Sequence, residues 1–175
     1  MATGNAGPLV SIRLYPTADD ELQSVALSIG AHIESGVPPS SIGVLLDDVA
    51  ARKTLHKLLA ILDCGSEDYS KPGGAKFIDI FDPSVKVLTT GSAKGIEFQV
   101  LFVPAITSSQ FPTSDADGET SDRARRRLYT AITRCAYELH LSAPQESASG
   151  LLDELNASFV QRHDLPHNSV NGTDE

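Results

Sequence analysis

The sequence predicts one α/β domain, in which a mainly parallel β-sheet carries helices on both of its faces. Short apolar runs typical of buried strands alternate with longer stretches whose apolar residues recur at helical spacing. Such alternation favours parallel strands joined by crossing helices. The length of 175 residues suits a single domain with a substantial core. The hydrophobic content of 41% and the charged content of 21% are ordinary for a globular protein.

The segments predicted as strands are short, rich in apolar and β-branched residues, and bounded by turn-forming residues. In chain order they are residues 9–15, 42–46, 77–81, 85–89, 100–104 and 138–142. The run 42–46 is continuously apolar, as expected of a strand that is buried on both faces. The run 77–81 is predicted only as a short edge strand.

Capping signals mark the first two helices. A Thr-x-x-Asp signature at Thr17 begins the first helix, which ends where Gly and Pro come together at residues 36–39. Either Asp47 or Asp48 can cap the second helix, because both precede its apolar stripe. This helix is expected to end near Gly65.

The second half of the chain adds a basic helix at about residues 122–135 and a final helix at about 151–160. Polar loops are expected at 63–76 and 113–121. We therefore expect a flexible leader at 1–8, one folded domain at 9–162 and a tail at 163–175 that is too polar to fold.

Charge and cysteine usage restrict the function. A formal net charge of −9 argues against binding nucleic acid through bulk electrostatics, so any DNA contact must be local or shared with another domain. Cys64 and Cys135 fit neither a disulfide framework nor a metal-ligand spacing, which favours a reducing cytoplasm and predicts no metal site. No apolar run is long enough to cross a bilayer, so no membrane partner is expected.

The first segment with chemical potential, residues 89–98, follows a predicted core strand. Its small residues and its two glycines let backbone amides approach a ligand, and Lys94 and Glu97 add one charge of each sign. It is not a phosphate-cradling P-loop, because Lys94 is followed by Gly95 and not by Ser or Thr. The alternative is a tight connection between core strands with a solvated Lys and Glu.

The second such segment is residues 125–135 of the basic helix. At helical spacing Arg123, Arg127 and Arg134 lie along one flank of its apolar face. Guanidinium groups beside a cleft can bind a phosphate or neutralise its developing charge. The alternative is a solvated basic face paired with the acidic loop before it.

Together and in this order, the two segments resemble motifs V and VI of the UvrD/Rep superfamily 1 DNA helicases. Motif V of that family reads roughly Thr-x-His-x-Ala-Lys-Gly-Leu-Glu-Phe, and a Phe-Pro pair follows it. The matching residues here are Thr89, Ala93, Lys94, Gly95, Glu97, Phe98, Phe111 and Pro112. Motif VI reads roughly Arg-Arg-Leu-x-Tyr-Val-Ala-x-Thr-Arg-Ala. Its matches are Arg125, Arg126, Tyr129, Ala131, Thr133 and Arg134.

This resemblance implies the second RecA-like lobe of such a motor, and it assigns roles at the matching positions. Arg134 would be the arginine finger that reaches the γ-phosphate of ATP, and Glu97 would contact the ribose hydroxyl. Gly95 would allow close approach to the nucleotide, and Lys94 would link the nucleotide cleft to the DNA track. The residues assigned to single-stranded DNA are Thr89, Thr90 and Ser92.

Some positions depart from the family pattern. Leu46 and Asp47 stand where the family usually has a Tyr and an Arg, Gly91 replaces a His, and Arg127 replaces a Leu. Because an Asp facing a γ-phosphate would be repulsive, either Asp47 only caps its helix or nucleotide handling has changed. Residues 42–62 resemble the motif IV region of the family, and the short interval between this region and motif V implies that the large accessory insertion of UvrD is absent.

The chain contains no Walker A or Walker B sequence and no Gln motif. We therefore expect the C-terminal motor lobe of an ATP-dependent DNA helicase or translocase. ATP and Mg²⁺ would be held mainly by an N-terminal RecA-like lobe, and the isolated chain would hydrolyse no ATP. The alternative is a RecA-like interaction or regulatory module without motor activity. A stand-alone nucleotide-binding enzyme is disfavoured, because no phosphate-binding glycine loop opens a helix.

Overall fold

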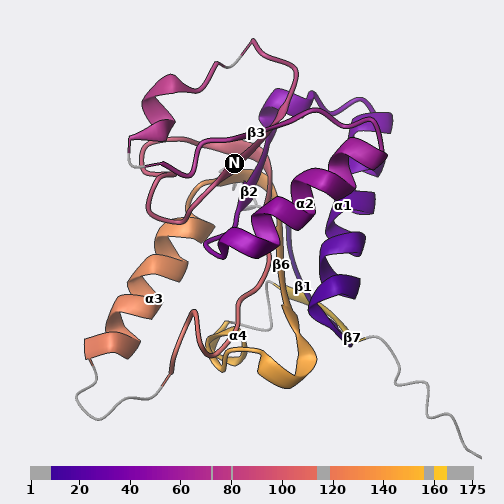
Figure 1. Ribbon diagram of the computed structural model, residues 1–175. Coiled ribbons are helices and arrows are strands. Elements are labelled where there is room, and N and C mark those ends of the chain that lie inside the picture. The colour runs from indigo at the N-terminus through magenta and orange to yellow at the C-terminus, as the bar shows by residue number, and fades with distance from the viewer. Residues whose placement is uncertain (1–8, 72, 80, 114–118, 156–159, 165–175) are drawn as a thin grey trace, which may run out of the picture.

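The computed structural model describes residues 9–71, 73–79, 81–113, 119–155 and 160–164 (Figure 1). Its strands are β1 (Leu9–Tyr15), β2 (Ile42–Leu45), β3 (Ser66–Asp68), β4 (Val85–Leu88), β5 (Phe98–Val103), β6 (Cys135–Pro144) and β7 (Val160–Asp164). They form one seven-stranded sheet in the order β3-β4-β2-β5-β6-β1-β7. All of the pairings between these strands are parallel, which confirms the expected α/β fold class.

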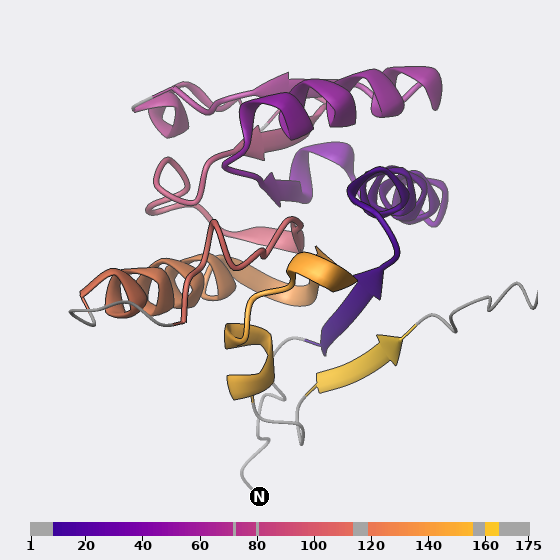
Figure 2. The same ribbon diagram turned by 60° about the horizontal axis from the view of Figure 1, so that its bottom comes forward.

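Helices cover both faces of this sheet. They are α1 (Ala18–Glu34), α2 (Val49–Ile61), α3 (Glu119–Ile132) and α4 (Leu151–Glu154). Figures 1 and 2 show α1 and α2 beside one another on one face, with α3 and α4 on the other. Two apolar clusters follow this division. One joins Ile29 of α1 and Leu55 of α2 to the sheet, and the other joins Leu128 of α3 and Leu151 of α4 to it.

The predicted caps hold where the structure tests them. The Thr17 side chain accepts a hydrogen bond from the Asp20 amide (3.1 Å) at the start of α1. At the start of α2 the cap is Asp48, which accepts from the Ala51 amide (2.7 Å). Arg52, only 7% exposed, closes the turn before α2 by donating to the carbonyl oxygens that precede the cap. Asp47 is therefore not needed as a cap.

Three predicted elements differ from the structure. Strand β3 lies inside the expected loop 63–76, because an exposed, polar edge strand carries no apolar signal. The expected strand 77–81 does not form: a 3₁₀ helix covers Gly74–Phe77, and Phe77 and Phe81 are exposed. The last helix is a single turn, α4, and Val160 belongs to β7 and not to a helix.

The boundaries of the domain stay partly predictions. The expected leader 1–8 lies outside the described residues, as does 114–118 of the acidic loop. Strand β7 continues to Asp164, two positions beyond the expected end of the domain at 162, and residues 165–175 are not described. Among the residues that the structure describes, no helix is long and apolar enough to span a bilayer.

Candidate nucleotide and DNA site

The turn after β4 is held by its own hydroxyl groups. The Thr89 amide and hydroxyl both lie 2.9 Å from the Ser92 hydroxyl, and the Ser92 amide donates to the Thr89 hydroxyl (3.0 Å). Further along the turn, Gly95 has a φ of +86°, a left-handed conformation that disfavours any residue with a side chain. This conformation accounts for Gly95 without any ligand. Lys94 and Glu97 are exposed beside it.

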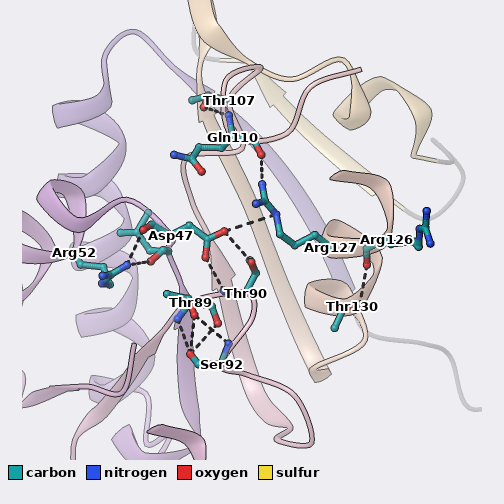
Figure 3. A network of polar contacts seen from close by, with 11 residues as sticks. Asp47, Arg52, Thr89, Thr90, Ser92, Thr107, Gln110, Arg126, Arg127 and Thr130 are labelled. Atoms are coloured by element: carbon teal, nitrogen blue, oxygen red, sulfur yellow. Dashed lines mark hydrogen bonds and ion pairs between the residues drawn. The ribbon is translucent and has the colours of Figure 1, made fainter. Parts of the chain in front are cut away.

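Asp47 anchors this turn to the end of β2 (Figure 3). One carboxylate oxygen accepts from the Thr90 amide and the other from the Thr90 hydroxyl, both at 2.8 Å. These contacts form because β2 and β4 are paired neighbours, so that the segments after their carboxyl ends meet. The idea that Asp47 only caps its helix is therefore wrong. Thr90 is 4% exposed, and its hydroxyl is used within the fold.

Arg127 of α3 completes the network from the other side. Its Nε lies 3.8 Å from a carboxylate oxygen of Asp47, and its terminal nitrogen donates to the Gln110 carbonyl (Figure 3). The guanidinium also lies 4.4 Å from the centre of the Phe111 ring. Two positions that depart from the helicase pattern, Asp47 and Arg127, thus face each other as opposite charges.

Arg134 and Glu97 come together at the other edge of the sheet. The Phe98 amide, next to Glu97, donates to the Arg134 carbonyl (2.8 Å), because β5 and β6 begin side by side. Among the residues that the structure describes, the Arg134 guanidinium bonds locally, to the Thr130 carbonyl and the Thr133 hydroxyl (both 3.2 Å). Its positive charge therefore lies at the end of α3.

Five of the seven expected site residues thus form two groups, and the other two connect them. Thr89, Thr90 and Ser92 follow the carboxyl end of β4, whereas Glu97 and Arg134 precede the amino ends of β5 and β6. Because the strands are parallel, these ends lie at opposite edges of the sheet. Strand β5, with six residues and so roughly 20 Å long, spans the interval between the edges. Lys94 and Gly95 lie on the connection from one group to the other.

A buried carboxylate, Glu21, supports the carboxyl edge from α1. It is 1% exposed and accepts from the Ala105 amide (2.8 Å) and the Ser142 hydroxyl (2.5 Å). Ala105 has a φ of +58°. Burial raises the pKa of Glu21, against the opposing effect of its two hydrogen bonds. Glu21 therefore ties the start of α1 to the ends of β5 and β6.

A parallel sheet with helices on both faces and polar turns at its strand ends is the architecture of a RecA-like lobe. The chain superimposes on the C-terminal domain of a possible DNA helicase from Lactobacillus plantarum with a TM-score of 0.68 and 20% identity, over 91% of this chain and 88% of that one. It also resembles the SWI2/SNF2 ATPase core of Sulfolobus solfataricus, with a TM-score of 0.50 and 10% identity over 91% of this chain and 40% of that chain. These likenesses establish the fold.

Residues 52–146, more than half of the chain, match the UvrD-like helicase C-terminal domain, and the chain belongs to that family. The similar proteins include DNA helicase II of Rickettsia typhi (38% identity over 63 residues, 34% of this chain) and a probable DNA helicase of Mycoplasma pneumoniae (30% over 113 residues, 63% of this chain). The matched regions cover only 10% and 18% of those two proteins.

Proposed function

We propose that this chain is the C-terminal motor lobe of an ATP-dependent superfamily 1 DNA helicase or translocase. Its partners would be an N-terminal RecA-like lobe of the same protein, which would hold most of the ATP and Mg²⁺, and single-stranded DNA. The observation that carries the proposal is the Phe98–Arg134 backbone hydrogen bond, which brings the backbone next to Glu97 beside Arg134, in a chain of this helicase family. The proposal includes a cytoplasmic location for the protein.

The nucleotide half of the proposal rests on the amino edge of the sheet. The hydrogen-bond partners of the Arg134 guanidinium in the described ranges come from its own helix end, so turning towards a phosphate would break no contact seen there with another element. The guanidinium of an arginine can bind a phosphoryl group during its transfer through two hydrogen bonds. An exposed carboxylate such as that of Glu97 can accept a hydrogen bond from a ribose hydroxyl. These two residues, with Gly95 and Lys94, fit one side of a nucleotide site.

The DNA half of the proposal rests on the turn after β4. Because the Thr90 hydroxyl is held by Asp47, we assign Thr90 to shaping the turn and to backbone contacts. Thr89 and Ser92 are partly exposed, and the neighbouring Gly91 is exposed. Such a surface can contact a sugar-phosphate backbone locally, as a chain with a net charge of −9 requires.

The test is the Arg134→Ala substitution in the full-length parent protein. Loss of an arginine finger should lower DNA-stimulated ATP turnover on the order of 10³-fold. Arg126→Ala is the matched control, because Arg126 is exposed on the same helix and points away from the Asp47 network (Figure 3). It should leave turnover near that of the wild type. A near-normal rate for Arg134→Ala, or ATP hydrolysis by the isolated chain, would contradict the proposal.

Asp47 favours a second candidate, an interaction or regulatory module without motor activity. The Asp47 carboxylate, fixed between Thr90 and Arg127, adds negative charge at the carboxyl ends of the strands. It stands where the family usually has an Arg that could contact phosphate. The full-length parent protein distinguishes the two functions. A parent protein that hydrolyses ATP in the presence of DNA supports the motor, whereas a parent without a P-loop lobe supports the module.

A further inference from the structure

Two histidines and a glutamate converge where the end of α1 crosses β6. His32 lies in the last turn of α1, and Glu138 and His140 lie on the same face of β6 because they are two positions apart. The His32 Nε2 is 3.3 Å from one Glu138 oxygen, and the His140 Nε2 is 3.0 Å from the other. The three ligand atoms all lie within 4.8 Å of one another.

Both rings are oriented by their other nitrogen. The His32 Nδ1 lies 2.7 Å from the Ser28 carbonyl oxygen, and the His140 Nδ1 lies 2.9 Å from the Ser11 hydroxyl. A carbonyl oxygen can only accept, so the His32 Nδ1 donates, which leaves Nε2, the nitrogen nearer Glu138, as the atom that can bind a metal ion. Such an outer hydrogen bond is the usual support of a metal-binding histidine.

Within the described parts of the chain, the His140 Nε2 is buried without a hydrogen-bond partner. The Glu138 oxygen is close to it, but it lies outside the direction that a hydrogen bond requires. The ring cannot turn freely to correct this, because it stacks on Phe102 with centroids 4.5 Å apart and meets the edge of the His32 ring at 5.4 Å. The packing thus holds an unsatisfied nitrogen towards a carboxylate.

We propose that His32, Glu138 and His140 bind one divalent transition-metal ion, for which Zn²⁺ is the best match. Tetrahedral Zn²⁺ takes N and O ligands at about 2.0–2.2 Å, which sets its neighbouring ligand atoms roughly 3.3–3.5 Å apart. The two nitrogen–oxygen distances, 3.3 and 3.0 Å, are near that spacing before any ion is added. One ion would satisfy the buried nitrogen and balance the carboxylate.

A small cavity lies behind His140, on the side of its Ser11 contact. A cavity of about 20 Å³ adjoins His140, and the Ser11, Ser24 and Ser28 side chains are among its lining. A space of this size can hold one water molecule, which would support the His140 ring from the side of its Nδ1. The two histidine side chains are each 16% exposed and that of Glu138 is 39% exposed, so an ion can enter from the Glu138 side. Bound metal would fasten the end of α1 to β6, the strand that begins directly after Arg134.

The test uses the 175-residue chain freed of metal with a chelator and titrated with Zn²⁺ by calorimetry. We expect binding of one ion per chain and an increased melting temperature. His32→Gln and His140→Gln should each weaken binding on the order of 100-fold or more, and Ser11→Ala, which removes an outer partner, about 10-fold. His56→Gln is the matched control, since His56 lies on α2 and bonds to Ser66, and it should bind as the wild type does.

Co²⁺ provides a measurement that needs no variant. In the wild-type chain it should give the intense visible absorption of a tetrahedral ion, and Zn²⁺ should displace it. Glu138→Gln, at the most exposed of the three positions, provides a variant that should fold normally and bind weakly. The proposal is wrong if the wild type binds no Zn²⁺, if His32→Gln and His140→Gln bind as tightly as the wild type, or if replacing His163 and His167 abolishes binding.

Discussion

Asp47→Ala should destabilise the domain more than an ordinary surface substitution. The change removes the acceptor of two 2.8 Å hydrogen bonds from Thr90, one from its amide and one from its hydroxyl. Thr90 is 4% exposed, so water cannot easily replace the lost carboxylate. The substitution therefore strands two polar groups at the turn that carries the proposed DNA contacts.

The magnitude follows from these contacts. Hydrogen bonds to a charged group contribute about 1.5–3 kcal/mol each, and a stranded buried donor costs about 1–3 kcal/mol. The Asp47 side chain is 19% exposed and some water can enter, so we expect a total loss of about 2–4 kcal/mol. The contact with Arg127, at 3.8 Å and with an arginine that is 35% exposed, should contribute less than about 1 kcal/mol of this.

Urea unfolding of the isolated domain measures this loss. Asp48→Ala is the control: it removes the cap of α2, one residue further along, and should cost only about 1 kcal/mol. Thr90→Ala combined with Asp47→Ala should cost little more than Asp47→Ala alone, because the two residues share one interaction. The reasoning fails if Asp47→Ala stays within about 0.5 kcal/mol of the wild type or if the two losses simply add.

Two further substitutions test other parts of the fold. The raised pKa of Glu21 means that the folded state binds this proton more tightly than the unfolded state, so the wild type should lose stability relative to Glu21→Gln as the pH rises above about 4.5. Urea midpoints of both proteins across that range measure this difference, and parallel curves would refute it. Gly95→Ala should cost about 1–2 kcal/mol because its φ is +86°. Gly91→Ala, where an added Cβ would meet only the Thr89 hydroxyl at 4.0 Å, should cost less; equal unfolding midpoints would exclude backbone strain at Gly95.

Elements with strong periodicity or capping were predictable from the sequence, and those set by tertiary context were not. Strand β1 and the Thr17 cap appear where expected, because alternation and capping are local properties. Strand β3 was missed because its exposed Ser-Glu-Asp sequence resembles a loop. Conversely, the apolar content of 77–81 favoured a strand, but Phe77 and Phe81 are exposed at 79% and 87%.

The candidate site was predictable only as two motifs. The sequence indicated which segments carry small and charged residues, but not that Thr90 would be buried against Asp47, 43 positions away. That contact depends on β2 and β4 being neighbours, and strand order has no local signature. Part of the signal was present in the sequence, since Asp47 follows the buried strand β2, and Thr89 and Thr90 follow the buried strand β4. The same limit hid the His32–Glu138–His140 group, because His32 lies on α1, far in the sequence from the Glu138–His140 pair on β6.

The place of β1 in the sheet has a consequence for biosynthesis. This first strand pairs with β6 and β7, and Ser11 meets its register partner His140, 129 positions later. At about 5–20 residues per second, a ribosome needs roughly 6–26 seconds to make that interval. During this time the nascent Leu-Val-Ser-Ile-Arg-Leu-Tyr segment has neither of its neighbours, and its open edges can pair with other chains. We therefore expect this lobe to depend on chaperones until its last strands leave the ribosome.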